Sequence, residues 1–97
     1  MTATPNIALI GIGRIGEVHA RTLARLGHLG RFAMIVDPRE DVARALAADF
    51  NVPKVATDPG DVFDDPDIDA VVIASPTDTH APCIEAAARA GKDIFTE

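Results

Sequence analysis

The chain has 97 residues, which limits it to one domain near the small end of the usual range. Its net charge of −6 and its pI of about 4.8 argue against nucleic acid or an anionic membrane as a partner. Cys83 is its only cysteine, which excludes an internal disulfide, and residues 1–6 lack a signal-peptide pattern, so we expect a cytoplasmic protein.

Apolar runs and helical patterns alternate along the chain, which predicts an α/β fold. Near-continuous apolar runs are typical of parallel strands that are buried on both faces. We therefore expect a Rossmann-type doubly wound parallel sheet of about five strands. The expected strands are 7–10, 32–36, 54–57 (at one edge), 70–75 and 93–96, and the expected helices are 14–26, 39–50 and 80–90.

Residues 11–16 read GIGRIG between the first expected strand and the first expected helix. This is the glycine pattern of a dinucleotide-binding turn. Gly11 permits the tight turn, Gly13 lets the backbone approach a pyrophosphate, and Gly16 lets the helix pack closely on the strand. The unpaired amides at the start of that helix suit a diphosphate.

Asp37 ends the second apolar run about twenty residues after this turn, where an acidic residue binds the hydroxyls of the adenosine ribose. A carboxylate there repels a 2′-phosphate, so we expect NAD as the cofactor in preference to NADP. Arg39 argues the other way, because a cation beside the ribose can accept a 2′-phosphate. We expect Arg39 instead to be a solvated cation at the start of the next helix.

Helical periodicity predicts which side chains face the sheet. In the first helix these are Ile15, Val18, Thr22, Leu23 and Leu26, and in the second Val42, Ala43, Leu46, Ala47 and Phe50. We expect His19 and Cys83 to pack, His28 to lie on a loop surface, and Gly27 and Gly91 to follow helix ends.

Residues 58–69 contain six aspartates and two prolines, the most acidic stretch of the chain. A divalent-metal site is one interpretation of this stretch. We expect instead that the carboxylates cap short helical turns or face water, and we assign no metal ligands. Val62 and Phe63 are expected to fix a short turn onto the sheet.

Four segments together resemble the N-terminal half of the glucose–fructose oxidoreductase / inositol dehydrogenase family (Gfo/Idh/MocA). They are GxGxxGxxH at 11–19, Asp37, the segment from Asp65 to His80, and Gly91 to Glu97. Within that family, residues 13–20 look most like the inositol 2-dehydrogenase branch. The resemblance implies a Rossmann domain that binds NAD and serves the dehydrogenation of a polyol or sugar.

The resemblance also implies roles for individual residues. The phosphate-binding turn is matched by Gly11, Gly13, Arg14, Ile15 and Gly16, and the adenosine-ribose ligand by Asp37. The loop that lines the cofactor between adenosine and nicotinamide is matched by Ser75, Pro76, Thr77 and His80. Glu97 matches a glutamate beside the nicotinamide ribose. For His80 we expect a part in the pocket architecture and no proton transfer.

In the family, a lysine that follows Glu97 and a histidine of a C-terminal domain assist the chemistry, and neither lies within residues 1–97. We therefore expect residues 1–97 to be an incomplete NAD-binding domain, inactive alone, whose parent is a homo-oligomer. The alternatives are a stand-alone NAD-binding regulatory module, or a remnant that keeps the fold and binds no nucleotide. Without a sixth strand, residues 94–95 are expected to form an exposed edge that lowers stability or self-associates.

Overall fold

A five-stranded parallel sheet organises the chain, in the order β3-β2-β1-β4-β5. The structure is a computed structural model that describes residues 4–25, 30–74 and 80–96. The strands are β1 (Asn6–Ile10), β2 (Arg31–Val36), β3 (Lys54–Ala56), β4 (Ala70–Ile73) and β5 (Asp93–Thr96). The helices are α1 (Arg14–Arg25), α2 (Glu40–Phe50), α3 (Gly60–Phe63) and α4 (His80–Arg89). The predicted Rossmann-type sheet is confirmed, with β3 at one edge.

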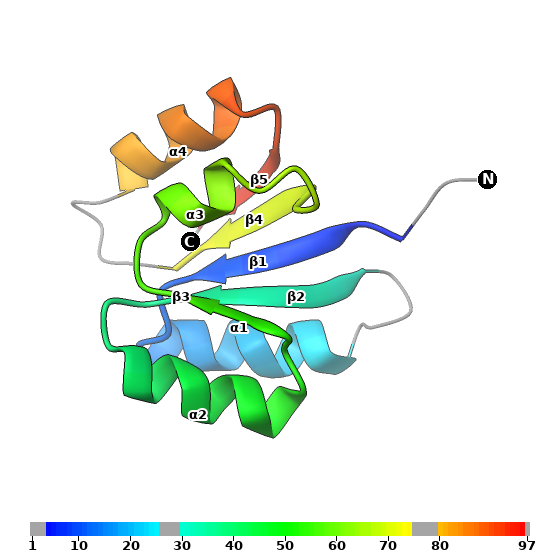
Figure 1. Cartoon of the computed structure of the whole chain (residues 1–97), viewed down its shortest axis with the longest axis vertical. Coiled ribbons are helices and arrows are strands. Elements are labelled where there is room, and N and C mark those ends of the chain that lie inside the picture. The colour runs from blue at the N-terminus through cyan, green and yellow to red at the C-terminus, as the bar shows by residue number, and fades with distance from the viewer. Residues whose placement is uncertain (1–3, 26–29, 75–79, 97) are drawn as a thin grey trace.

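Helices cover the sheet from both sides (Figure 1). α1 and α2 lie on one face, beside β1, β2 and β3, whereas α3 and α4 lie on the other face. The chain therefore leaves β1 toward β3 on one face and returns to β4 on the other. This reversal next to β1 and β4 is the topological switch point, where open α/β sheets bind ligands beyond the carboxyl ends of their strands.

Two hydrophobic clusters, one on each face, explain why the strands are apolar at nearly every position. Along β1, Ala8 and Ile10 join the cluster under α3 and α4, while Leu9 between them joins the cluster under α1 and α2. β4 alternates in the same way, whereas in β2 the consecutive Ala33 and Met34 both join the cluster under α3 and α4, where the register between β1 and β2 shifts. Each central strand must therefore supply apolar side chains to both faces, and the periodicity of a half-exposed strand is absent.

The buried face of α1 differs from the one that periodicity predicted. Val18 is 56% exposed and Thr22 is exposed, whereas Ala20 is fully buried against the sheet. Leu23 is half-buried, as its prediction requires. The prediction for Val18 and Thr22 was wrong, because the face of α1 that meets the sheet runs through Ala20 and Leu23.

The other helices follow their predicted patterns more closely. In α2, Ala43 and Ala47 are buried and Leu46 and Phe50 pack beside them, whereas Val42 is partly exposed, contrary to prediction. Cys83 of α4 is buried, as predicted. Gly91 follows α4 with φ +74°, the conformation of a glycine that ends a helix, which confirms its predicted place. Gly27 and His28 lie outside the described residues.

The acidic stretch uses its carboxylates in turns and in ion pairs with Lys54. Asp58 Oδ1 accepts a hydrogen bond from the Gly60 amide at 2.9 Å, and Asp65 Oδ1 accepts one from the Asp67 amide at 2.9 Å. The other oxygen of Asp65 lies 2.7 Å from Lys54 Nζ. Asp58 thus satisfies the first amide of the short helix α3, as expected of a capping carboxylate, and Asp65 serves a turn outside the helices. Val62 of α3 is fully buried. Among the described residues, no group of His, Cys, Asp and Glu is arranged to hold a metal ion.

A helix that spans a membrane needs about 20 consecutive apolar residues. None of the helices in residues 4–25, 30–74 and 80–96 is long and apolar enough to cross a bilayer.

Candidate cofactor site

The candidate site lies where the strands end, and backbone hydrogen bonds join these ends to one another. The Gly11 amide donates to Val36 O at 2.8 Å, which ties the turn after β1 to the end of β2. The Ala74 amide donates to Ile10 O at 2.8 Å, and this bond ties the end of β4 to β1. The turn after β1 is therefore held at a fixed place between its two neighbouring strands.

Glycine is required at positions 11 and 13 of the GIGRIG turn for two different physical reasons. Gly11 has φ +91°, a conformation that residues with a Cβ rarely adopt, so the turn itself requires a glycine there. Gly13 is exposed and has no positive φ, and an added Cβ would meet no atom within 4 Å. Neither the backbone conformation nor the packing explains Gly13, which leaves the approach of a ligand as the physical reason for its missing side chain.

Asp37 is the one charged residue among the buried side chains of the described chain, with 5% of its surface exposed. It follows β2 directly, and its Oδ2 accepts a hydrogen bond from the Ile12 amide at 3.0 Å. Its Oδ1 accepts one from the Arg39 amide at 2.9 Å. These two amides fix the carboxylate beside the glycine turn.

The charge state of Asp37 follows from opposing effects. Burial alone raises the pKa of this carboxyl, because it penalises the charged form. The hydrogen bonds from the Arg39 side chain and from the amides of Arg39 and Ile12 act in the other direction, and together they hold the pKa below its ordinary value of 3.8. Asp37 is therefore an ionised hydrogen-bond acceptor at neutral pH, as a ligand for ribose hydroxyls must be.

Arg39 is exposed at the start of α2, as expected, but it also forms an ion pair with Asp37 that was not expected. It lies at the N-terminal boundary of α2, and its Nε lies 2.9 Å from Asp37 Oδ1 in an ion pair. Its Nη2 donates to Asp37 Oδ2 at 3.3 Å. The pair was not predicted from the sequence, because a spacing of two residues does not fix where a turn directs a flexible side chain.

The remaining predicted site residues are described only in part or not at all. Arg14, Ile15 and Gly16 form the first turn of α1, but their side-chain surroundings are outside the description. His80 begins α4, and its side chain is likewise not described. Ser75, Pro76, Thr77 and Glu97 lie outside the described residues. The structure thus brings together the glycine turn and Asp37, and the other assignments stay predictions.

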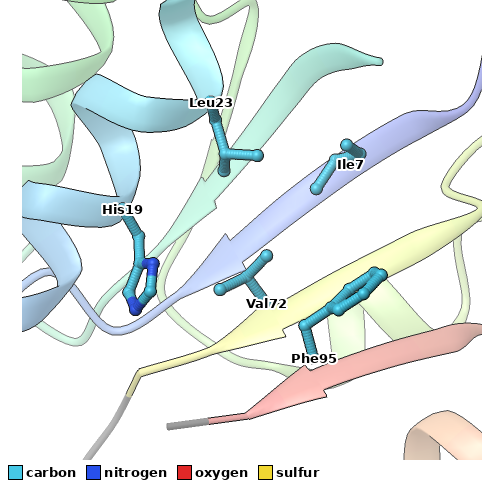
Figure 2. Close-up of a pocket in the computed structure, with 5 residues that line it drawn as sticks. All are labelled: Ile7, His19, Leu23, Val72 and Phe95. Atoms are coloured by element: carbon cyan, nitrogen blue, oxygen red, sulfur yellow. The ribbon is translucent and has the colours of Figure 1, made fainter. Parts of the chain in front are cut away.

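A mainly apolar concavity lies beside α1, apart from the glycine turn and Asp37 (Figure 2). It has a volume of about 320 Å³ and is lined by Ile7, His19, Leu23, Val72 and Phe95. His19 and Leu23 project from α1 toward the strands that carry the other three side chains. The half-buried His19 agrees with the prediction that this residue packs.

The sequence of this chain matches a known protein family. The model of the family GFO_IDH_MocA, described as an oxidoreductase family with an NAD-binding Rossmann fold, matches residues 5–97. Among the relatives, the scyllo-inositol 2-dehydrogenase (NAD(+)) of Bacillus subtilis is 39% identical over 90 residues, which make up 93% of this chain and 26% of the relative.

Solved structures agree with this result. The scyllo-inositol dehydrogenase from Lactobacillus casei with bound cofactor NAD(H) and scyllo-inositol superposes with a TM-score of 0.90 at 31% identity, covering 97% of this chain and 28% of that one. A levoglucosan dehydrogenase in complex with NADH has a TM-score of 0.89 at 32% identity, covering 97% of this chain and 27% of that one. This chain therefore spans 26–28% of the length of these three proteins.

Proposed function

Since this chain belongs to the Gfo/Idh/MocA family of oxidoreductases, which has an NAD-binding Rossmann fold, we propose that it is the cofactor-binding part of an NAD-dependent dehydrogenase. The proposed substrate of the whole protein is a polyol or sugar, oxidised at a CH–OH group as in an inositol 2-dehydrogenase. The names of the relatives support this substrate class. Residues 1–97 would form the NAD-binding domain, and a separate part of the whole protein would bind the substrate.

The observation that carries the proposal is the pairing of Asp37 with the turn around Gly13. Asp37 is buried, ionised and held by the Ile12 amide, so its carboxylate lies next to the backbone of the phosphate-binding turn. Gly13 leaves open space where a side chain would stand. A dinucleotide needs both features, since its diphosphate must approach the backbone while its ribose meets a carboxylate.

Each part of the site has a proposed role toward the cofactor. The turn from Gly11 to Gly16 and the first amides of α1 would bind the diphosphate, and Asp37 would accept hydrogen bonds from the ribose hydroxyls. His80, Glu97 and the loop 75–77 would line the path toward the nicotinamide. Bound NAD would supply the acceptor for a hydride.

We assign no catalytic acid or base within residues 1–97. Removal of a hydroxyl proton needs a positioned base beside the substrate, and none of our assigned residues has that role. We therefore propose that the 97-residue chain binds NAD without oxidising a substrate. Turnover of inositol by this chain alone would contradict that part of the proposal.

An amide-resolved NMR titration with NAD tests the binding role. We expect shifts concentrated in residues 11–16 and around Asp37. Gly13→Ala should keep the unfolding midpoint but weaken NAD binding by about tenfold or more, because the new methyl group lies where the diphosphate approaches.

Gly91→Ala is the matched control, because it should lower the stability of the chain without changing NAD binding. Gly91 has φ +74°, so an alanine there should cost about 1 kcal/mol of stability through backbone strain. Gly91 precedes β5, which β4 separates from β1 and its glycine turn, so this substitution should leave NAD affinity unchanged. A well-dispersed spectrum that does not change on adding NAD would overturn the proposed function and favour a remnant that binds no nucleotide.

A further inference from the structure

The ribose-binding carboxylate of the proposed function already has a charged partner within the chain. Each oxygen of Asp37 accepts two hydrogen bonds. Oδ1 accepts from the backbone amide and from Nε of Arg39, both at 2.9 Å. Oδ2 accepts from the Ile12 amide at 3.0 Å and from Nη2 of Arg39 at 3.3 Å. Half of these donors belong to the Arg39 guanidinium, which takes the positions that ribose hydroxyls would need.

The two kinds of donor differ in how easily they leave. The amides of Ile12 and Arg39 belong to turns that are fixed by the ends of β1 and β2. The Arg39 side chain is 55% exposed, whereas the Asp37 side chain is 6% exposed. An ion pair with one partner in water is weak, because water replaces its hydrogen bonds. The guanidinium can therefore turn outward while the carboxylate keeps its orientation.

The pair also changes the charge that a cofactor meets. A lone carboxylate at this position repels the 2′-phosphate of NADP, and an arginine beside it accommodates that phosphate. Asp41 adds a further negative charge near Arg39, whereas Glu40 is occupied by Arg44, at 3.1 Å. Arg39 thus places a positive charge beside the Asp37 carboxylate, the group that discriminates between NAD and NADP.

We propose that Arg39 determines the cofactor specificity of this site. It competes with the hydroxyls of the NAD ribose for Asp37, and once displaced it pairs with the 2′-phosphate of NADP. The site therefore binds both NAD and NADP. The ratio of its affinity for NAD to its affinity for NADP is smaller than Asp37 alone would give. This inference rests on the proposed function, because it concerns the same ribose site.

Dissociation constants for NAD and NADP, measured by calorimetry on the 97-residue chain at low and at high salt, test the proposal. Arg39→Ala should weaken NADP binding by about tenfold or more, since a hydrogen-bonded charge pair with the phosphate is lost. NAD binding should stay the same or improve, because the competitor for Asp37 is gone. The NADP affinity of the wild-type chain should fall with salt, and that of Arg39→Ala should fall less.

Arg44→Ala is the matched control, since it removes the same charge from an exposed arginine of α2 that pairs with Glu40. It should leave the NAD to NADP ratio unchanged. A second readout needs no cofactor, because the carboxyl pKa of Asp37, followed by carbon NMR, should rise in Arg39→Ala and not in Arg44→Ala.

The outcomes separate this inference from the proposed function. A wild-type chain that binds neither cofactor overturns both. A chain that binds NAD, with a ratio that Arg39→Ala leaves unchanged or that Arg44→Ala moves equally, overturns the inference and leaves the proposed function standing.

Discussion

Asp37 shows how a buried charge can be retained in a domain of this size. Isolated carboxylates avoid the interior because desolvation favours their neutral form. Here two backbone amides and a guanidinium supply donors to both oxygens. The result is a preorganised acceptor whose orientation does not depend on a ligand, which is the property that a specific ribose site requires.

Asp37 should also contribute to the pH dependence of stability. Its pKa in the folded chain is lower than its ordinary value of 3.8, so its contribution is fully present above pH 3.8 and is lost as the pH falls through the lower, folded-state pKa. Urea unfolding of the wild type and of Asp37→Asn between pH 2 and pH 7 measures this. The wild type should be the more stable at pH 7, and the difference should shrink only below about pH 4. A difference that is constant with pH would contradict the assignment.

Cys83 should react slowly with thiol reagents while the chain is folded. Its side chain is buried in α4, and burial raises the pKa of its thiol, so both access and the thiolate fraction are reduced. We expect alkylation at pH 8 to be at least about tenfold slower in buffer than in 6 M urea. Equal rates would place the thiol at the surface or show that the chain is not folded under these conditions.

At the scale of elements, the sequence predicts most of the architecture because the strongest signals are local. The central strands must be apolar on both faces, and Gly91 and the aspartates of the turns carry their conformational preference in their own chemistry. Asp37 could be predicted as a site residue because the strand places it. The pair between Asp37 and Arg39 could not, since it depends on how one turn directs a flexible side chain.

The buried face of α1 also lay beyond local signals. Periodicity places Val18 and Thr22 on an apolar stripe, but it does not fix how the helix is rotated about its axis when it packs on the sheet. In the structure Ala20 is the buried residue of this helix, and Val18 and Thr22 are exposed. The residue that α1 buries against the sheet is therefore the small Ala20, which contributes little to a hydropathy pattern.

Substitutions in α1 test this corrected face. Ala20→Leu should destabilise the chain by about 1–3 kcal/mol, because the larger side chain has no space against the sheet. Val18→Ala should change stability by less than about 0.5 kcal/mol, since Val18 is mostly exposed. Free energies of unfolding from urea titrations measure both. A larger loss for Val18→Ala than for Ala20→Leu would restore the face that periodicity predicts.

At the scale of the whole molecule, the two edges of the described sheet differ in what they present to solvent. β3 is a three-residue strand, whereas β5 has four residues and carries Phe95, which is 61% exposed. Short strands are poor templates for pairing, and an exposed apolar strand edge is a good one. The face beside Phe95 continues into the apolar concavity below α1 (Figure 2). The most exposed large apolar side chain of the described residues, Phe95, thus lies on the edge strand β5 beside this concavity.

The 97-residue chain should therefore self-associate through β5. Sedimentation velocity at increasing protein concentration should show a rising weight-average sedimentation coefficient. Phe95→Lys should suppress this rise, because a charge on an edge strand opposes pairing with a second strand. Val18→Lys is the control, since Val18 is an apolar residue of similar exposure on a helix that has no unpaired strand edge. If the wild type stays monomeric at all concentrations, or if both variants suppress association equally, β5 is not the contact.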